Sequence, residues 1–127
     1  MPFVKIEIVA GKTPEYKKLL LQTVHDALVS GLEIPEDDRL QRLYELPPEC
    51  FEYRETVTDK ITLIELSLFP GRSKDKKTNV ITDITRLLGE RLSIPAGDIY
   101  IIINEPPLEN WGLRGQSASD MRLQYKK

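Results

Sequence analysis

The sequence predicts an α/β (α+β) fold built from two tandem β-α-β units: a four-stranded sheet with both helices on one face, followed by a C-terminal hairpin. Residues 2–45 align with residues 62–105 at a constant shift of 60 positions. In each copy an alternating apolar stretch is followed by apolar residues at helical spacing, then by an Ile-Pro pair and a second apolar run. The eight identities between the copies are weak evidence alone, and the shared hydrophobic pattern is the stronger observation.

The first element of each copy is predicted to be a strand. Apolar side chains occupy every second position, and polar or charged residues stand between them. This period of two is typical of a strand with one buried face. The alternating apolar positions are Val4, Ile6 and Ile8 in the first copy and Ile64, Leu66 and Leu68 in the second.

A helix is predicted to follow each strand after a glycine turn. Thr13 and Ser73 are the expected N-caps, and Pro14 stands at the first helical position, where its missing N–H costs nothing. Each helix should end before an Ile-Pro pair, because the residue before a proline is pushed out of the helical region. The predicted buried faces are Leu20, Val24, Ala27, Leu28 and Leu32, then Val80, Ile84, Leu87, Leu88 and Leu92.

The second strand of each copy is predicted at LQRLYE (40–45) and IYIIIN (99–104). A right-handed crossover makes the two strands of one copy parallel. The segment 46–60 reads as a loop with a short extended piece at 50–54, and the glycine-rich tail after Glu105 as a hairpin. One sheet face has no helices over it, so self-association is expected to cover it.

Composition indicates one domain, residues 1–127, with no nucleic-acid footprint, since the net charge is −2. The longest apolar runs are too short to span a membrane. Cys50 is the only cysteine, and no signal-peptide pattern is present, so a cytoplasmic protein is expected. His25, the only histidine, is expected to be a surface or partly buried helix residue, and no metal-ligand cluster is predicted.

Pro2 has two interpretations. A proline is tolerated at the first residue of a strand. Alternatively, removal of Met1 would give Pro2 a free secondary amine whose direction is fixed by its ring. An ordinary α-amino group has a pKa of about 7.7–8.0. Partial burial and a nearby Arg72 would lower that pKa and produce a base near neutral pH. Thr62, the equivalent residue of the second copy, has no free amine, so only one copy could be active.

Arg72 and Lys12 occupy equivalent positions just before the helix N-caps. A cation is mildly unfavourable at a helix start, so the pattern indicates either an anion site or an ordinary solvated loop cation. Asp38 is a candidate for acid–base chemistry, yet its repeat partner Asp98 stands in the same I-P-x-x-D pattern, where an aspartate often closes a turn.

Three aromatic residues could line an apolar pocket or simply be part of the core. Trp111 is the only tryptophan and lies in the polar, glycine-rich tail. Tyr44 and Phe51 are the other candidates, and the sequence leaves both alternatives open for all three.

These residues resemble the tautomerase superfamily, whose members are built from β-α-β units and begin with a catalytic proline. The likeness rests on the MP start, the GKT and GRS turns, IPEDDR and NWGLRGQ. It is strongest to the doubled-length members, which include malonate semialdehyde decarboxylases and bacterial probable tautomerases. The resemblance implies a homotrimer, a small carboxylate substrate, and no cofactor or metal.

Roles follow from the resemblance at matching positions. Pro2 would be the catalytic amine, Arg72 the carboxylate-binding arginine, Asp38 a residue that handles water or the amine's protonation, and Trp111 a hydrophobic wall. Pro70 stands where the decarboxylases have a second arginine. The resemblance therefore favours keto–enol tautomerisation with Pro2 as base. Two alternatives stay open: a decarboxylase or hydratase with Pro2 as general acid, and a non-catalytic module that binds small molecules.

Overall fold

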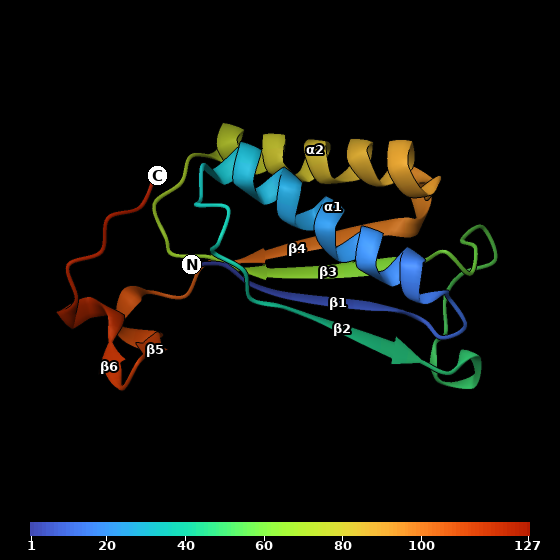
Figure 1. Cartoon of the computed structure of the whole chain (residues 1–127), viewed down its shortest axis with the longest axis horizontal. Helices are drawn as coiled ribbons and strands as arrows, with labels where there is room; N and C mark the ends of the chain where they lie inside the picture. The colour runs from blue at the N-terminus through green and yellow to red at the C-terminus, as the bar shows by residue number, and fades with distance from the viewer.

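A computed structural model describes residues 1–127, and it consists of one mixed sheet with two long helices packed on one of its faces (Figure 1). The predicted class is confirmed. The sheet and helices are β1 (Phe3–Val9), α1 (Pro14–Leu32), β2 (Gln41–Leu46), β3 (Thr62–Ser67), α2 (Lys74–Leu92) and β4 (Ile99–Asn104); the predicted tail hairpin is β5 (Gly112–Leu113) and β6 (Gln116–Ser117).

The sheet has the order β2-β1-β3-β4. The strands of each copy are parallel, β1 with β2 and β3 with β4, as the crossover rule requires. The two copies meet where β1 pairs antiparallel with β3, and Ile6 is opposite Ile64 in that register. The edge strands β2 and β4 therefore come from different copies.

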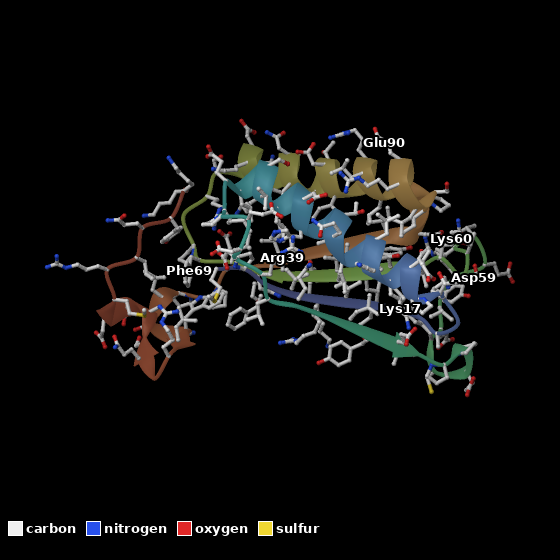
Figure 2. All side chains as sticks on the ribbon, in the orientation of Figure 1. Lys17, Arg39, Asp59, Lys60, Phe69 and Glu90 are labelled. Carbon is white, nitrogen blue, oxygen red and sulfur yellow. The ribbon has the colours of Figure 1, made fainter.

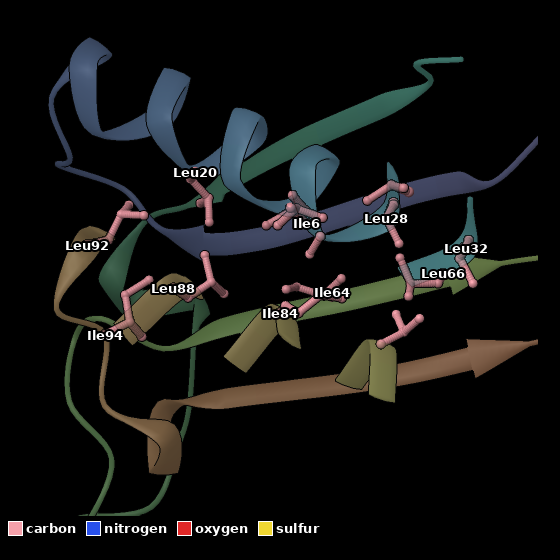
Figure 3. Close-up of a cluster of buried hydrophobic side chains, with 14 of the residues drawn as sticks. Ile6, Leu20, Leu28, Leu32, Ile64, Leu66, Ile84, Leu88, Leu92 and Ile94 are labelled. Carbon is pink, nitrogen blue, oxygen red and sulfur yellow. The ribbon is translucent and has the colours of Figure 1, made fainter. Parts of the chain in front are cut away.

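The main core lies between the helices and the sheet (Figure 3). The alternating apolar positions of β1 and β3 point toward the helices, and the predicted helical faces meet them. Leu87 is only partly buried, and every other predicted helix position is buried. Two short 3-10 turns, at 108–110 and 118–120, and the β5–β6 hairpin build a smaller second core around Trp111.

The predicted N-caps are confirmed, because the Thr13 and Ser73 hydroxyls accept hydrogen bonds from the backbone N–H groups of Tyr16 and Lys76. Both helices end before their Ile-Pro pairs, as predicted, but the way they end was not predicted. Each helix stops through a left-handed residue, Glu33 at φ 56° or Ser93 at φ 57°, one position before the Ile-Pro pair. The chain has therefore already left the helix before the proline acts on its neighbour.

The joining segment contains a 3-10 turn at 48–50. Phe51 has extended backbone within the piece predicted at 50–54, and no paired strand forms there. The open face of the sheet carries charged as well as apolar side chains. Lys5 lies 3.8 Å from a Glu7 oxygen and 3.9 Å from a Glu65 oxygen on this face, while its exposed apolar residues are concentrated on β4. No helix is long and apolar enough to cross a membrane.

Candidate active site

The N-terminus, the loop after α1, the loop into α2 and the C-terminal tail meet at one end of the sheet (Figure 1). They enclose a cavity of about 640 Å³, a size typical of small-molecule sites. The residues that line it are Met1, Glu33, Ile34, Pro35, Asp38, Phe69, Arg72, Leu113, Arg114, Leu123, Gln124, Tyr125 and Lys126.

The chain's terminal amine lies in this cavity beside a carboxylate. The Met1 nitrogen is 3.8 Å from Oδ2 of Asp38, and Pro2 is buried immediately behind it at the start of β1. Burial lowers the pKa of this amine; the Asp38 carboxylate opposes that shift, and the Arg72 guanidinium reinforces it. The net direction is downward, so the environment favours the neutral amine.

Arg72 reaches the cavity from the turn that precedes α2. Gly71 adopts φ +114° there, a conformation that favours glycine, and Arg72 is the next residue. Its side chain is only 6% exposed; Nη1 donates to the Phe69 carbonyl at 3.0 Å, and the buried Nε has no acceptor in the chain. An unpaired buried donor is costly. A guanidinium that lines a cavity can bind a carboxylate through its other N–H groups.

Tyr125, from the C-terminal tail, supports Arg72. Its ring centre is 5.5 Å from the guanidinium carbon and 5.1 Å from the Phe69 ring. Its hydroxyl donates to the Pro70 carbonyl at 2.8 Å. The tail is thus fastened across the turn that carries Arg72, and the aromatic face stabilises the cation.

Asp38 and Asp98 stand in equivalent turns of the two copies, but their carboxylates contact different groups. In both, the backbone N–H bonds the carbonyl of the proline three positions earlier, at 3.0 and 2.9 Å. The Asp98 carboxylate is 1% exposed and accepts hydrogen bonds from the Thr58 N–H and hydroxyl. The Asp38 carboxylate faces the terminal amine instead. The backbone closes the turn at Asp38, which leaves its carboxylate free for another role.

His25 is fully buried, contrary to the expectation of a surface or partly buried position. Its Nε2 is 2.8 Å from the Glu36 carbonyl oxygen, and since a carbonyl only accepts, Nε2 carries the hydrogen. This bond ties α1 to the loop that presents Asp38.

For Trp111, the core alternative of the two left open by the sequence fits the structure. Trp111 is buried in the second core, with its ring centre 4.8 Å from Phe69 and 5.1 Å from Phe3. It therefore lies behind the Phe69 wall and does not line the cavity. Its Nε1 donates to the Pro106 carbonyl at 3.0 Å.

Tyr44 and Phe51 are not brought to this cavity within one chain. Tyr44 is on the open sheet face and is 44% exposed. Phe51 packs against the Val9, Val57 and Ile61 cluster, at the end of the sheet where β1 finishes. Within a single chain the three aromatic residues therefore do not share a pocket. Tyr44 lies on the open sheet face, and Phe51 lies at the opposite end of β1 from the cavity.

The second copy has a corresponding pocket at the opposite end of the molecule, around Lys12, Asp59 and Lys60. Figure 2 labels Phe69 at one end and Asp59 with Lys60 at the other. The Lys12 ammonium donates to the Asp59 carbonyl at 2.9 Å. The position that corresponds to the terminal amine is here an ordinary peptide bond, because the chain continues through it. Only one end of the sheet can therefore have a free amine.

Sequence reasoning missed the tail and the tip of the hairpin as parts of the cavity wall. Tyr125, Lys126 and Arg114 all line the cavity. The Arg-Gly pair at 114–115 was a signal for a turn, but no local pattern shows which cavity a turn borders.

Comparisons with known proteins identify the family. Two family models, both described as tautomerase enzyme, match residues 38–114 and residues 2–61. The chain therefore belongs to the tautomerase family.

Among its relatives is the probable tautomerase YusQ of Bacillus subtilis (strain 168), 24% identical over 116 residues that make 87% of this chain and 91% of that protein. The 2-hydroxymuconate tautomerase of Comamonas testosteroni is 35% identical over 57 residues, 45% of this chain and 90% of that protein. This second relative has half the length, in keeping with a doubled chain.

Solved structures show the same fold. A malonate semialdehyde decarboxylase superimposes with a TM-score of 0.82 at 22% identity, covering 92% of this chain and 94% of the other. A fused 4-OT, solved as an asymmetric trimer, gives a TM-score of 0.83 at 24% identity, covering 92% and 96%. At these identities the likeness establishes the fold alone.

Proposed function

We propose that this chain is a keto–enol tautomerase that acts on a small 2-hydroxy-2-enoate or the corresponding 2-oxo acid, with Pro2 as general base and no cofactor. The observation that carries the proposal is that the terminal amine, Arg72 and Asp38 share one cavity. Removal of Met1 would make the Pro2 nitrogen the terminal amine, one residue nearer to β1. The proposal treats residues 1–127 as one domain of two pseudo-repeats, 2–45 and 62–105.

In the proposed reaction the substrate carboxylate binds Arg72. The neutral Pro2 nitrogen accepts the proton of the enol hydroxyl as the carbonyl forms, and a proton is returned from that nitrogen to carbon. Burial lowers the pKa of the Met1 amine in this cavity, and after removal of Met1 the Pro2 amine would lie in the same surroundings. A lowered pKa supports this direction, because a base must be unprotonated before it can act. Trp111 supports the wall of the site through Phe69.

A second candidate is decarboxylation or hydration of a 3-oxo acid with Pro2 as general acid. The Asp38 carboxylate, 3.8 Å from the Met1 amine, favours the ammonium form of a terminal amine at this place and so favours this chemistry. The net downward shift of the amine pKa favours the base. Pro70 in place of a second arginine also argues against a decarboxylase.

The assembly proposed is a homotrimer in which the open sheet faces are covered. The exposed apolar residues of β4 support it, as does the trimeric assembly of the fused 4-OT relative. Tyr44 and Phe51 would reach a substrate only from another subunit, so their roles depend on this assembly. The cytoplasmic location expected from the sequence stays a prediction.

The test compares two N-termini. One variant carries an alanine between Met1 and Pro2, so that removal of methionine leaves Pro2 with an amide nitrogen. The processed wild type should convert enol acids to keto acids, and the extended variant should lose at least about 100-fold in kcat/KM, since the general base is gone. Intact mass verifies each N-terminus, and equal unfolding midpoints show that the fold is unchanged.

Both proteins are assayed against enol acids and 3-oxo acids. Equal activity of the two N-termini, or an active protein that wholly retains Met1, would contradict the proposal. Turnover of 3-oxo acids alone would favour the second candidate.

A further inference from the structure

His25 is a buried polar side chain that the proposed reaction does not use. It is 1% exposed and stands among the buried residues of α1. A buried polar group is tolerated where it is hydrogen-bonded, and an unpaired one is costly. The Nε2–H of His25 donates to the Glu36 carbonyl, with 2.8 Å between the two heavy atoms. The turn that carries Asp38 therefore receives a buried donor from α1.

The second copy shows how the same turn forms when the helix supplies no histidine. Ala96 is equivalent to Glu36, and its carbonyl accepts a hydrogen bond from the backbone N–H of Ile99. This bond closes a 3-10 turn over Ala96–Asp98. Thr85, at the position of the histidine, donates its hydroxyl to a carbonyl of its own helix. In this copy the backbone alone satisfies the carbonyl.

The first copy replaces that backbone bond. The N–H of Arg39 bonds the Asp37 carbonyl at 3.0 Å, so the Glu36 carbonyl is left to the histidine. No 3-10 turn forms there, and the Asp38 carboxylate faces the terminal amine. The two turns thus differ in the donor at one equivalent carbonyl, and their aspartates face different groups.

Other contacts between this turn and α1 lie at the surface. The Arg39 guanidinium donates to the Gln22 side chain at 3.2 Å and to the Glu36 carboxylate at 2.9 Å. That carboxylate is also 3.6 Å from Nε2 of His25, but it is 65% exposed. Exposed pairs contribute little, because solvent screens them and long side chains must be ordered. The buried histidine bond is the contact that can fix the turn.

We propose that His25 is a positioning residue, whose hydrogen bond to the Glu36 carbonyl holds the turn so that the Asp38 carboxylate lies beside the terminal amine. The proposal rests on the proposed function for the identity of that amine as the Pro2 nitrogen. It adds a residue that acts on the site through Asp38 and touches neither the substrate nor the amine.

The pKa of the terminal amine reports where the Asp38 carboxylate lies. The charged groups that act on this amine are Asp38, which raises its pKa, and Arg72, which lowers it together with burial. A turn that moves the carboxylate away leaves the lowering effects unopposed. The amine pKa should then fall, and its measurement requires no turnover.

The test follows the NMR shift of the N-terminal nitrogen against pH in the full-length protein, labelled with heavy-nitrogen proline and methionine. The residue that ends the mature chain is the one that titrates, and intact mass identifies it. Wild type is compared with Asp38→Asn, His25→Met and His25→Gln. Methionine fills the buried space without a donor, whereas glutamine offers an amide N–H near the place of Nε2. Circular dichroism shows that each variant is folded.

His25→Met should lower the amine pKa by at least about half of the shift that Asp38→Asn produces, because the carboxylate is no longer held in place. His25→Gln should keep the wild-type value within about 0.2, because the donor is retained. The double variant His25→Met/Asp38→Asn should match Asp38→Asn alone, since both changes act through one carboxylate. Gln22→Leu is the matched control on the same helix; it removes the exposed contact with Arg39 and should leave the amine pKa unchanged.

The proposal is overturned if His25→Met keeps the wild-type amine pKa, if its shift adds in full to that of Asp38→Asn, or if His25→Gln behaves as His25→Met does. In the wild type itself, an Nε2–H of His25 that exchanges freely with water would also overturn it, whatever the variants do. No substrate is used, so the outcome is separate from catalysis. The expected pKa pattern in a protein without tautomerase activity would sustain the role of His25 and refute the proposed reaction. Activity that depends on Pro2, with no effect of His25→Met on the amine pKa, would do the reverse.

Discussion

Asp38 is the residue that separates the two chemistries open to this site. Its carboxylate raises the pKa of the terminal Met1 amine, against the larger lowering by burial. Asp98, at the equivalent position, is committed to Thr58 and is remote from the amine. The two aspartates therefore provide a matched pair for experiment.

Asp38→Asn should lower the pKa of the terminal amine, since the change removes a negative charge that lies beside this end of the chain. If Pro2 is a base, kcat/KM for an enol acid rises with pH through the amine pKa and then levels off. In the variant that rise should occur at lower pH than in wild type, with a similar plateau, as measured from pH–rate profiles. A descending profile, or a well-folded but inactive variant, would instead identify Pro2 as an acid.

The control is Asp98→Asn, which should leave the pH profile unchanged. It should lower the free energy of unfolding by about 1–3 kcal/mol, because it weakens a buried hydrogen-bonded carboxylate. Asp38→Asn should cost less stability, since no side-chain donor of the chain bonds its carboxylate. Urea unfolding of both variants measures the difference.

Arg72 and Lys12 diverge for the same reason as the aspartates. Equivalent backbone turns present both cations at helix starts, yet Lys12 is held by the Asp59 carbonyl and Arg72 packs beneath Tyr125. The environment of each cation is therefore set by a residue far away in the sequence, Asp59 or Tyr125, and not by the local turn.

At the scale of elements, the two β-α-β units meet through their helices as well as through β1 and β3. Gly31 of α1 lies against α2, and a Cβ at this position would be 2.8 Å from Cγ2 of the buried Val80. Glycine is therefore required by the close approach of the helices, although it weakens a helix interior. Gly89 of α2 has more room, because a Cβ there would lie 3.6 Å from its nearest neighbouring atom, the Ile94 carbonyl oxygen.

Gly31→Ala should lower the free energy of unfolding by about 1–3 kcal/mol, because the overlap with Val80 outweighs the gain in helix propensity. Gly89→Ala is the matched control and should be neutral or stabilising by up to about 1 kcal/mol, since the space exists. Denaturant unfolding measures both. Equal stabilisation of the two variants would show that the helices separate easily at Gly31.

At the scale of the whole molecule, the uncovered sheet face is the main unpartnered surface. The charged side chains at its centre, on β1 and β3, form ion pairs with one another: Lys5 pairs with Glu7 and with Glu65. The apolar side chains at its edge, on β4, have no such partners within the chain: Tyr100 is 44% exposed and Ile102 is 55% exposed. Contacts between subunits should therefore involve β4.

Ile102→Lys should convert the proposed homotrimer to a smaller species, since a buried unpaired ammonium at an interface is unfavourable. Ile81→Lys changes an apolar residue of α2 that is 39% exposed on the helical side, and it should leave the trimer intact. Sedimentation velocity at micromolar concentration measures both. A wild-type monomer, or a trimer that tolerates Ile102→Lys, would contradict this assembly.

Much of the fold was predictable from the sequence because its signals are local. Alternation in residues 4–8 defines β1 and its buried face, and helical spacing with a threonine or serine cap defines where α1 and α2 begin. The shift of 60 residues then gives the topology, since one connected β-α-β unit has one favoured hand. The left-handed residues that end the helices were missed because Glu33 and Ser93 have no unusual side chain for that position.

The sequence by itself determined the elements, their order, and Pro2, Arg72 and Asp38 as candidates for the chemistry. Only the tertiary structure decided which candidates meet, because the cavity is assembled from segments up to about 125 positions apart, from Met1 to Lys126. The local sequence around the two aspartates does not predict that Asp38 faces an amine while Asp98 faces Thr58. Those partners depend on which chain segment packs against each turn, and that packing is fixed by burial across the whole molecule.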